Sequence, residues 1–239
     1  MGLLRIDKIL SSQNIATRTE TKSMIKKGLI TVNGELVKRP EEKYDPDTAV
    51  INVAGKRVDF KKYLYIMMNK PAGVLSASRD NYTPTVIDLL PDEIKREGLF
   101  PAGRLDKDTT GFLLITDDGE LAHKMLSPKS HVYKLYEAEC DRKLTKQDAR
   151  KFAEGIVCGD ISFLPAEMKI TGENKALVEI CEGKFHQVKK MFSSVGAEVI
   201  SLKRLRIGEI FLDESLKQGE FRELTESEIK GILSRKHGI

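Results

Sequence analysis

The residues best suited to chemistry lie in a short polar loop between two glycines. Gly103 and Gly111 bracket a segment that carries one arginine, two carboxylates and two threonines, namely Arg104, Asp106, Asp108, Thr109 and Thr110. The apolar run from Phe112 to Ile115 follows at once and predicts a buried strand. A loop fixed to a rigid strand can hold a reactive carboxylate still. The same pattern also fits a polar loop whose two aspartates are simply solvated.

One reading of Asp106-Lys107-Asp108-Thr109 is the DxDxT motif of phosphotransferases that use an aspartyl nucleophile with magnesium. That class needs the motif directly after a hydrophobic strand, so that the carboxylates emerge at the carboxyl end of the strand. Here the predicted strand follows the motif. The inverted order argues against a phosphotransferase.

Metal chemistry is the second reading. His123, His131 and His186 are scattered, and their spacings fit no metal-binding motif. We therefore predict no metal site.

The composition allows a substantial core and only a mild basic excess. The chain has 239 residues, of which 40% are hydrophobic and 32% charged, with a net charge of +4. This length suits one large domain, or a small one followed by a medium one. Residues 1–62 hold 13 lysines and arginines against 8 acids, and residues 184–206 hold 6 against 1. These two regions are the candidates for contact with an anionic partner.

The three cysteines, Cys140, Cys158 and Cys181, are odd in number and lack CxxC spacing. They argue against a disulfide framework and against a zinc site, and they suit a reducing cytosol. No stretch resembles a signal peptide or a membrane span. We therefore expect a cytoplasmic protein.

The N-terminal residues predict two helices and a small sheet. Residues 4–11 read as a short helix. A second helix begins at Thr17, where Glu20 completes a capping box, and ends near Gly28. Asn33-Gly34 between two β-prone runs predicts a hairpin. The second helix carries the basic side chains Arg18, Lys22 and Lys26, and a basic face of this kind suits either an anionic partner or plain solvation.

These N-terminal features resemble the S-four (αL-type) RNA-binding module. The likeness is carried by Arg5-Ile6-Asp7-Lys8 and by Gly28-Leu29-Ile30-Thr31-Val32-Asn33-Gly34. The resemblance implies binding through phosphate contacts and RNA shape. The residues expected to make these contacts are Arg5, Arg18, Lys22 and Lys26.

The remaining residues predict a second, larger domain. Strands are expected at residues 64–68, 112–115, 134–140, 177–180 and 199–202. Helices are expected at residues 85–90, 120–126 and 145–154, in the stretch that starts at a turn near Glu182 and ends at Gly196, and from Thr225 onward. Lys70 lies in a turn, where a lysine can contact phosphate but is more often solvated, so a solvated side chain is expected. Strands outnumber helices without regular βαβ alternation, so we predict an α+β fold with a mixed, largely antiparallel sheet flanked by helices.

Three stretches of this region resemble the ribosomal-RNA pseudouridine synthases of the small-subunit (RsuA) type. They are residues 103–111, Lys134-Leu135-Tyr136, and Glu182-Gly183-Lys184-Phe185-His186-Gln187-Val188-Lys189-Lys190-Met191. The turn Asn69-Lys70-Pro71-Ala72-Gly73-Val74 and the N-terminal module fit the same family. The likeness covers nearly the whole chain. It implies a cofactor-free isomerase that detaches uracil from ribose, rotates it and rejoins it through carbon 5.

The resemblance also implies residue roles. Asp106 matches the family's catalytic aspartate, which would attack the sugar or remove a sugar proton. Lys189 matches its basic partner, with Lys184 as a rival for that role. Tyr136 matches the tyrosine that packs on the target uracil. On its own residues, Tyr136 is an ordinary strand aromatic suited to a core.

Arg104 is expected to fill the place of the flipped base and to hold phosphate. Asp108 is expected to cap the loop or to orient Arg104. Lys184, His186 and Gln187 are expected to contact RNA.

The resulting prediction is an enzyme with an RNA-binding domain at residues 1–60 and a catalytic domain at residues 61–239. Its activity is the conversion of uridine to pseudouridine in ribosomal RNA, with the small subunit favoured. The expected partner is ribosomal RNA or an assembly intermediate of a ribosomal subunit, and the expected state is a monomer away from membranes. The alternative is an RNA-binding ribosome-assembly factor without catalysis.

Overall fold

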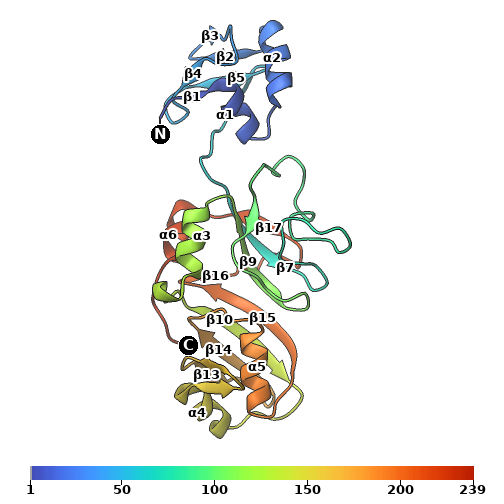
Figure 1. Cartoon of the computed structure of the whole chain (residues 1–239), viewed down its shortest axis with the longest axis vertical. Helices are drawn as coiled ribbons and strands as arrows, with labels where there is room; N and C mark the ends of the chain where they lie inside the picture. Colours follow the sequence, from blue (N-terminus) through green and yellow to red (C-terminus); the bar gives the residue numbers. More distant parts are fainter. Residues whose placement is uncertain (1) are drawn as a thin grey trace. The chain divides into compact units, whose positions relative to one another are not determined.

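The computed structural model describes residues 2–239, so Met1, where the first predicted domain begins, lies outside the described residues. The chain forms two compact units (Figure 1). One contains the residues up to Tyr63 together with Leu90–Leu99. The other contains Leu64–Leu89 and Phe100–Ile239. No helix in the described part of the chain is long and apolar enough to cross a membrane.

The N-terminal unit packs two helices on a small sheet. The helices are α1 (Ile6–Ser12) and α2 (Arg18–Lys26). The sheet has the order β3-β2-β5-β6, and a separate pair joins β1 to β4. These strands are β1 (Leu4–Arg5), β2 (Ile30–Val32), β3 (Glu35–Leu36), β4 (Lys43–Tyr44), β5 (Ile51–Val53) and β6 (Lys56–Arg57). Fully buried Ile6, Ile9 and Leu10 from α1 meet Ile30 and Ile51 from the sheet in one apolar core.

Of the local features predicted in this unit, the capping box and the hairpin turn are confirmed, and the start of the first helix is wrong. Thr17 accepts the backbone N–H of Glu20 and completes the predicted capping box. Asn33 and Gly34 have φ of 52° and 87°, as the hairpin turn requires. The predicted start of the first helix at residue 4 is wrong, because Leu4–Arg5 pairs with Lys43–Tyr44 as a strand.

The second unit is built on one large mixed sheet. Its central path runs β13-β14-β10-β15-β9-β7-β17, with β8 beside β9 and β16 beside β15. Its strands are β7 (Tyr65–Lys70), β8 (Phe100–Pro101), β9 (Thr110–Thr116), β10 (Lys134–Cys140), β13 (Glu167–Ile170), β14 (Lys175–Ile180), β15 (Val199–Ile207), β16 (Ile210–Phe211) and β17 (Phe221–Glu223). The short hairpin β11 (Ile156–Cys158) and β12 (Ile161–Phe163) stands apart. The pairing of β9 with β15 is parallel, and the others along the path are antiparallel, so the predicted fold class is confirmed.

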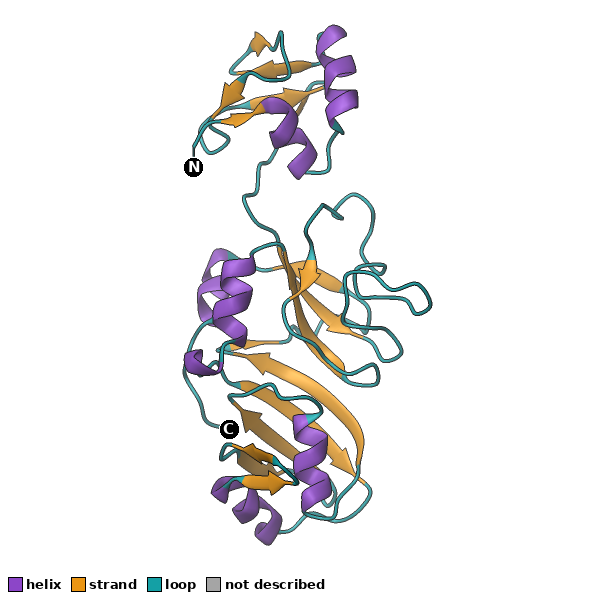
Figure 2. Cartoon of the chain, in the orientation of Figure 1, coloured by secondary structure: helices purple, strands orange, loops and turns teal. Residues whose placement is uncertain are grey.

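Helices cover this sheet at two places. Near β7 and β9, α3 (Gly119–Leu126) and α6 (Glu226–Ile232) pack over the buried strand residues Met67, Phe112 and Leu114. Figure 2 shows these two helices next to each other. Farther along, α5 (Gln187–Ser194) packs on β15, and its Phe192 contacts Phe152 of α4 (Lys146–Glu154) at 5.0 Å between ring centroids. The single turn η1 (Pro128–Ser130) follows α3.

The predicted helix at residues 85–90 does not form. Thr85 instead makes a bridge with Leu75, and its backbone N–H donates to the carboxylate of Asp88. Side chains that bond nearby backbone groups compete with the helix, and so short a segment cannot offset the cost of helix nucleation. The predicted strand at residues 199–202 is longer than expected and continues to Ile207, since β10 pairs along its length.

Candidate active site

The loop between β8 and β9 is held to the sheet at its final glycine. Gly111 pairs with Arg204 of β15 across the parallel register, and its φ is 97°. A Cβ atom at residue 111 would overlap the backbone of Arg204. Glycine is therefore required twice, for its backbone angle and for the close approach of the two strands.

Lys70 fixes the same loop from beneath. It ends β7, is fully buried, and its Nζ donates to the carbonyls of Pro71 (3.0 Å), Asp106 (3.1 Å), Lys107 (3.2 Å) and Thr109 (3.0 Å). Burial lowers the pKa of Lys70 to about 8, although the charges of Asp108 and Asp106 act in the opposite direction. The expectation of a solvated lysine is wrong. The neighbouring residues in the sequence predicted a turn lysine in solvent. In the structure, the loop at residues 103–111 folds over the Lys70 side chain.

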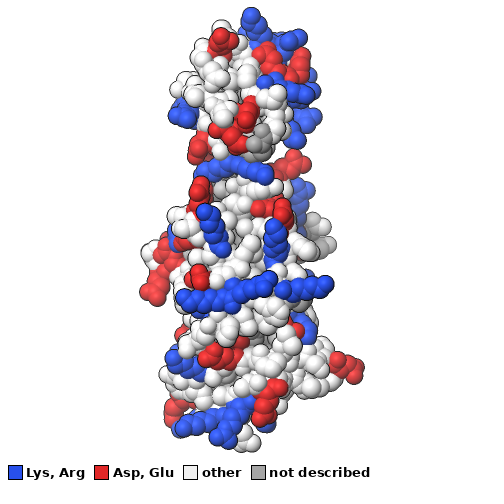
Figure 3. Space-filling model, turned by 90° about the vertical axis from the view of Figure 1, so that its left-hand side faces the viewer, with Lys and Arg blue, Asp and Glu red and all other residues white. Residues whose placement is uncertain are grey.

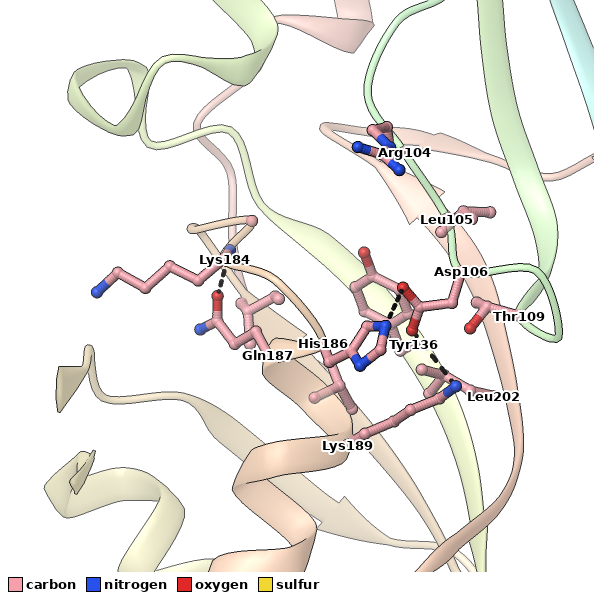
Figure 4. A pocket seen from close by; sticks show the side chains of 13 residues that line it. Arg104, Leu105, Asp106, Thr109, Tyr136, Lys184, His186, Gln187, Lys189 and Leu202 are labelled. Carbon is pink, nitrogen blue, oxygen red and sulfur yellow. Dashed lines mark hydrogen bonds and ion pairs between the residues drawn. The ribbon is translucent and has the colours of Figure 1, made fainter. Parts of the chain in front are cut away.

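Asp106 lies between two basic side chains at the start of α5 (Figure 4). Lys189 of α5 brings its Nζ to 3.3 Å from Asp106 Oδ2, and His186, the residue before α5, brings its Nε2 to 3.3 Å from Asp106 Oδ1. The Asp106 side chain is 24% exposed. The Asp106 carboxylate is therefore partly shielded from water and held between these two basic groups.

Asp108 shares Lys189 with Asp106. Lys189 Nζ donates to both oxygens of Asp108, at 2.6 and 2.8 Å. This hydrogen bond holds the pKa of Asp108 below its usual range. Burial alone would lower the pKa of Lys189, but Asp108 and Asp106 together raise it above its ordinary value. The expectation that Asp108 orients Arg104 is not met, because Asp108 bonds the cation that also faces Asp106.

Tyr136 forms one wall of the pocket above β10. Its side chain is 8% exposed, and Arg204 lies behind it, with Nη1 3.4 Å from the Tyr136 hydroxyl and Nε donating to the Phe112 carbonyl at 2.7 Å. Lys134 is buried on the same face two residues earlier, and burial with the nearby Arg204 lowers its pKa to about 8. Arg204 therefore supports the tyrosine, and Lys134 is a second buried basic side chain nearby.

Asp106, Tyr136, His186 and Lys189 line one pocket, which also includes Arg104, Leu105, Leu202 and Thr109. Arg104 is exposed at the rim and makes no hydrogen bond or ion pair with any residue of 2–239 (Figure 4). Its guanidinium is thus available to a ligand. The loop, β10 and the start of α5 each supply one side of the site, which brings Asp106, Tyr136 and Lys189 together as the motifs suggested.

Two other predicted residues are placed differently from what the sequence suggested. Lys184 pairs with Glu182 at 2.8 Å and donates to the Ser162 carbonyl at 2.6 Å, and Figure 4 shows it directed away from Asp106. It is therefore not the cation beside Asp106. Gln187 is buried, accepts the Lys184 backbone N–H and donates to Glu182, so its amide holds the loop before α5.

The basic residues predicted in the N-terminal unit divide into two kinds. Arg5 is held by a bidentate pair with buried Asp7, at 3.0 and 2.7 Å. Arg18, Lys22 and Lys26 are exposed along α2. Figure 3 shows lysine and arginine side chains gathered along one side of this unit. The α2 cations are free to meet an anionic surface, whereas Arg5 already has a partner.

Two supporting residues were missed from the sequence. The sequence offered one sign that Lys70 is buried: it lies just after a predicted apolar strand, directly before Pro71-Ala72-Gly73. For Arg204 the only sequence sign of burial was its alternation with Leu202 and Arg206. The strand that carries it was predicted to stop at residue 202. The burial of Arg204 depends on the pairing of β15 with β9 and β10, which no local pattern shows.

Comparison with known proteins agrees with this geometry. The family model described as RNA pseudouridylate synthase matches residues 64–194, and the S4 domain model matches residues 4–50. The chain belongs to the RNA pseudouridylate synthase family. The predicted resemblance is thereby confirmed, as is the prediction of an enzyme of this class.

Relatives of this family match along almost the whole chain. The uncharacterized RNA pseudouridine synthase YtzG of Bacillus subtilis is 45% identical over 231 residues, covering 95% of this chain and 97% of the relative. The ribosomal small subunit pseudouridine synthase A of Vibrio cholerae is 40% identical, covering 96% and 99%. A crystal structure of a pseudouridylate synthase superposes with a TM-score of 0.67 at 34% identity, covering 96% and 99% of the two chains.

Proposed function

We propose that this enzyme converts uridine to pseudouridine in small-subunit ribosomal RNA, with Asp106 as its catalytic carboxylate. The observation that carries the proposal is the placement of Asp106 3.3 Å from both Lys189 and His186, in a pocket walled by Tyr136. The small-subunit substrate is supported by the printed name of the Vibrio cholerae relative, which is 40% identical along nearly the full length of both chains.

Asp106 acts in its ionised form on the sugar of the target nucleotide. It either attacks the ribose or removes a ribose proton, and both routes need a carboxylate held still beside a cation. Lys189 supplies that cation. The uracil then turns and rejoins through carbon 5, so the reaction rearranges the atoms of the substrate and calls for no cofactor.

Tyr136 supports the uracil during this rotation. Its ring offers a stacking surface and its hydroxyl a site for proton transfer. Arg204 bonds that hydroxyl from behind and fixes the ring against the sheet. Leu202 adds an apolar contact in the same pocket.

The target nucleotide reaches the pocket by leaving its stack. Base flipping costs a few kcal/mol, which contacts to the extruded nucleotide must offset. Arg104 has an unpaired guanidinium at the rim. We assign it to the vacated stacking position and to a phosphate.

The N-terminal residues 1–60 serve as the RNA-binding domain and residues 61–239 as the catalytic domain. Exposed Arg18, Lys22 and Lys26 on α2 supply phosphate contacts. The protein is proposed to act as a monomer in the cytoplasm, on ribosomal RNA or on an assembly intermediate. The alternative of a non-catalytic assembly factor finds no support among the relatives, which are named as synthases.

The substrate is tested by mapping pseudouridines in ribosomal RNA from cells with and without the gene. One small-subunit position should lose its pseudouridine on deletion, regain it with the wild-type gene and fail to regain it with Asp106→Asn. Loss from large-subunit RNA alone would contradict the proposed substrate. Comparing naked RNA with assembly intermediates in vitro then identifies the form that the enzyme accepts.

A further inference from the structure

Phe185 is a large apolar side chain in solvent at the mouth of the pocket. Its side chain is 71% exposed, whereas Phe112, Phe152 and Phe192 of the same unit are fully buried. It stands between Lys184 and His186, which line the pocket, but does not itself belong to the pocket wall. Exposing a phenylalanine forfeits the free energy of burying it, so its position beside a ligand pocket calls for a ligand that covers it.

The Phe185 ring is held in a fixed stack. It lies 3.8 Å from the His186 ring, centroid to centroid, at an interplanar angle of 21°. His186 has a left-handed backbone with φ of 53°, a conformation that costs a non-glycine residue free energy. This turn at the start of α5 places two consecutive rings face to face. Because His186 Nε2 is 3.3 Å from Asp106, the stack runs from solvent to the proposed catalytic carboxylate.

A cation without an acidic partner lies over the same ring. Lys190 Nζ is 5.1 Å from the Phe185 centroid. Among residues 2–239, Lys190 makes no ion pair, in contrast to Lys184 with Glu182 and Lys189 with Asp108. An aromatic platform with an unpaired cation is the combination by which proteins bind unstacked nucleotides, since the ring stacks on the base and the cation meets the phosphate.

We propose that Phe185 and His186 form a stacking platform for the base of a nucleotide next to the target uridine, with Lys190 contacting its phosphate. The proposal rests on the proposed function, because it requires a flipped uridine in the pocket. The target base itself belongs between Tyr136, Leu202 and Asp106. Phe185 lies outside that wall, where the neighbouring nucleotides must pass.

The stacking energy of the neighbouring base explains why such a platform helps. Flipping one nucleotide removes a stacking partner from each base beside it. An exposed aromatic ring at the mouth replaces one lost partner without reading sequence, because every base has a π-face. A protein partner is the competing occupant, but an unpaired ammonium over the ring favours an anionic ligand.

The test compares Phe185→Ala with Phe211→Ala on a short RNA containing the target uridine. Phe211 is a matched control, because it is 55% exposed and has Arg206 5.2 Å from its ring, yet lies outside the pocket. Phe185→Ala should weaken RNA affinity about tenfold, equivalent to about 1.4 kcal/mol, with the loss falling on KM rather than kcat. Phe211→Ala should bind like the wild type.

A second arm identifies the base that stacks. An abasic site placed 5′ or 3′ of the target should weaken wild-type binding by the same factor at one of the two positions. At that position the abasic RNA should bind Phe185→Ala no more weakly than the intact RNA does. A loss in Phe185→Ala that is the same with every RNA, or that falls on kcat, would mean that the ring only supports His186 and would overturn the platform.

The conservative variant Phe185→Trp gives a direct readout. The chain has no tryptophan, so the new indole is the sole fluorophore of its kind. RNA should change its emission, and affinity should return to the wild-type value. Unchanged emission and unchanged affinity in both variants would reject the proposal. Wild-type isomerisation of the same RNA is measured in parallel, so absence of product in the wild type would reject the proposed function instead.

Discussion

At the scale of single residues, the site depends on the different surroundings of two aspartates that share one lysine. Lys189 bonds both oxygens of Asp108 and lies 3.3 Å from Asp106. The Asp108 side chain is 74% exposed and the Asp106 side chain 24%. Asp108 therefore keeps Lys189 charged and in place from the solvent side, while Asp106 faces the pocket. Neighbours in sequence thus take separate roles.

Lys70 is a residue whose removal should be costly. Lys70→Met would leave three backbone carbonyls of the site loop, and that of Pro71, without this donor. Unsatisfied buried polar groups cost about 1–3 kcal/mol each, partly offset by solvent and relaxation, so we expect a loss of about 3 kcal/mol in the free energy of unfolding. Urea denaturation near neutral pH measures this loss, and a variant as stable as the wild type would contradict the assigned bonds.

The same variant should reveal the lowered pKa of Lys70. Its folded-state pKa is about 8, below the ordinary lysine pKa of 10.5, so between these values the unfolded chain binds more protons than the folded one. Wild-type stability therefore rises with pH in this window relative to Lys70→Met. Lys134 contributes equally to both proteins and cancels. A difference in stability that stays constant from pH 8 to 10.5 would contradict the burial of a lysine charge here.

Asp106, Tyr136 and Lys189 were selected through the family resemblance of three local motifs, and the structure places the three side chains in one pocket. The sequence alone misjudged Lys70 and overlooked Arg204. Whether a long basic side chain is solvated or buried depends on which other segments pack over it. Lys70 bonds Asp106 and Arg204 bonds Phe112, and both partners lie more than 30 positions away in sequence. Burial of a charge is a tertiary property that a motif does not encode.

At the scale of elements, the parallel pairing of β9 with β15 attaches the end of the site loop to the sheet. Gly111→Ala should destabilise the protein by about 3 kcal/mol, because the new Cβ meets the Arg204 backbone and the φ of 97° disfavours any side chain. Gly73→Ala is the matched control, with φ of 89° and open space around the Cβ, and should cost about 1 kcal/mol. Equal losses in thermal or urea unfolding would contradict the close strand contact.

Elements with strong terminal signals were predicted correctly. Thr17 forms the predicted capping box, and Thr145 and Thr225 form capping boxes at the starts of two further predicted helices. Failures occurred where distant pairing overrides local preference. Leu4–Arg5 forms a strand with Lys43–Tyr44, and β15 runs five residues past its predicted end because β10 lies beside it. Strand limits are set by partners, and partners are not readable locally.

At the scale of the whole molecule, the proposed function divides the basic residues between RNA binding and chemistry. Replacing both Lys22 and Lys26 by alanine should weaken RNA binding and make the slope of log affinity against log salt shallower by about 1.5. Lys124→Ala with Lys143→Ala removes two lysines that already pair with Glu120 and Glu173, and should leave the slope unchanged. Equal effects of the two double variants would assign the effect to net charge alone.

One grouping at this scale was not predicted. Residues 90–99 belong with the N-terminal unit, although they lie between two parts of the other unit in sequence. Asn14 donates to the Asp92 carbonyl at 2.7 Å, and Arg96 donates to the Lys61 carbonyl at 2.9 Å. A single division of the sequence at residue 60 cannot assign Leu90–Leu99 to the N-terminal unit. No local sequence signal shows that this segment packs there.

In the proposed mechanism Asp106, and not its neighbour Asp108, carries out the isomerisation. The most direct measurement is tritium release from ribosomal RNA labelled at carbon 5 of uridine, compared for the wild type, Asp106→Asn and Asp108→Asn. We expect no release above background from Asp106→Asn, and release from Asp108→Asn within about tenfold of the wild type, since Asp108 contributes through Lys189. Wild-type release by Asp106→Asn, or its loss in Asp108→Asn alone, would contradict the account.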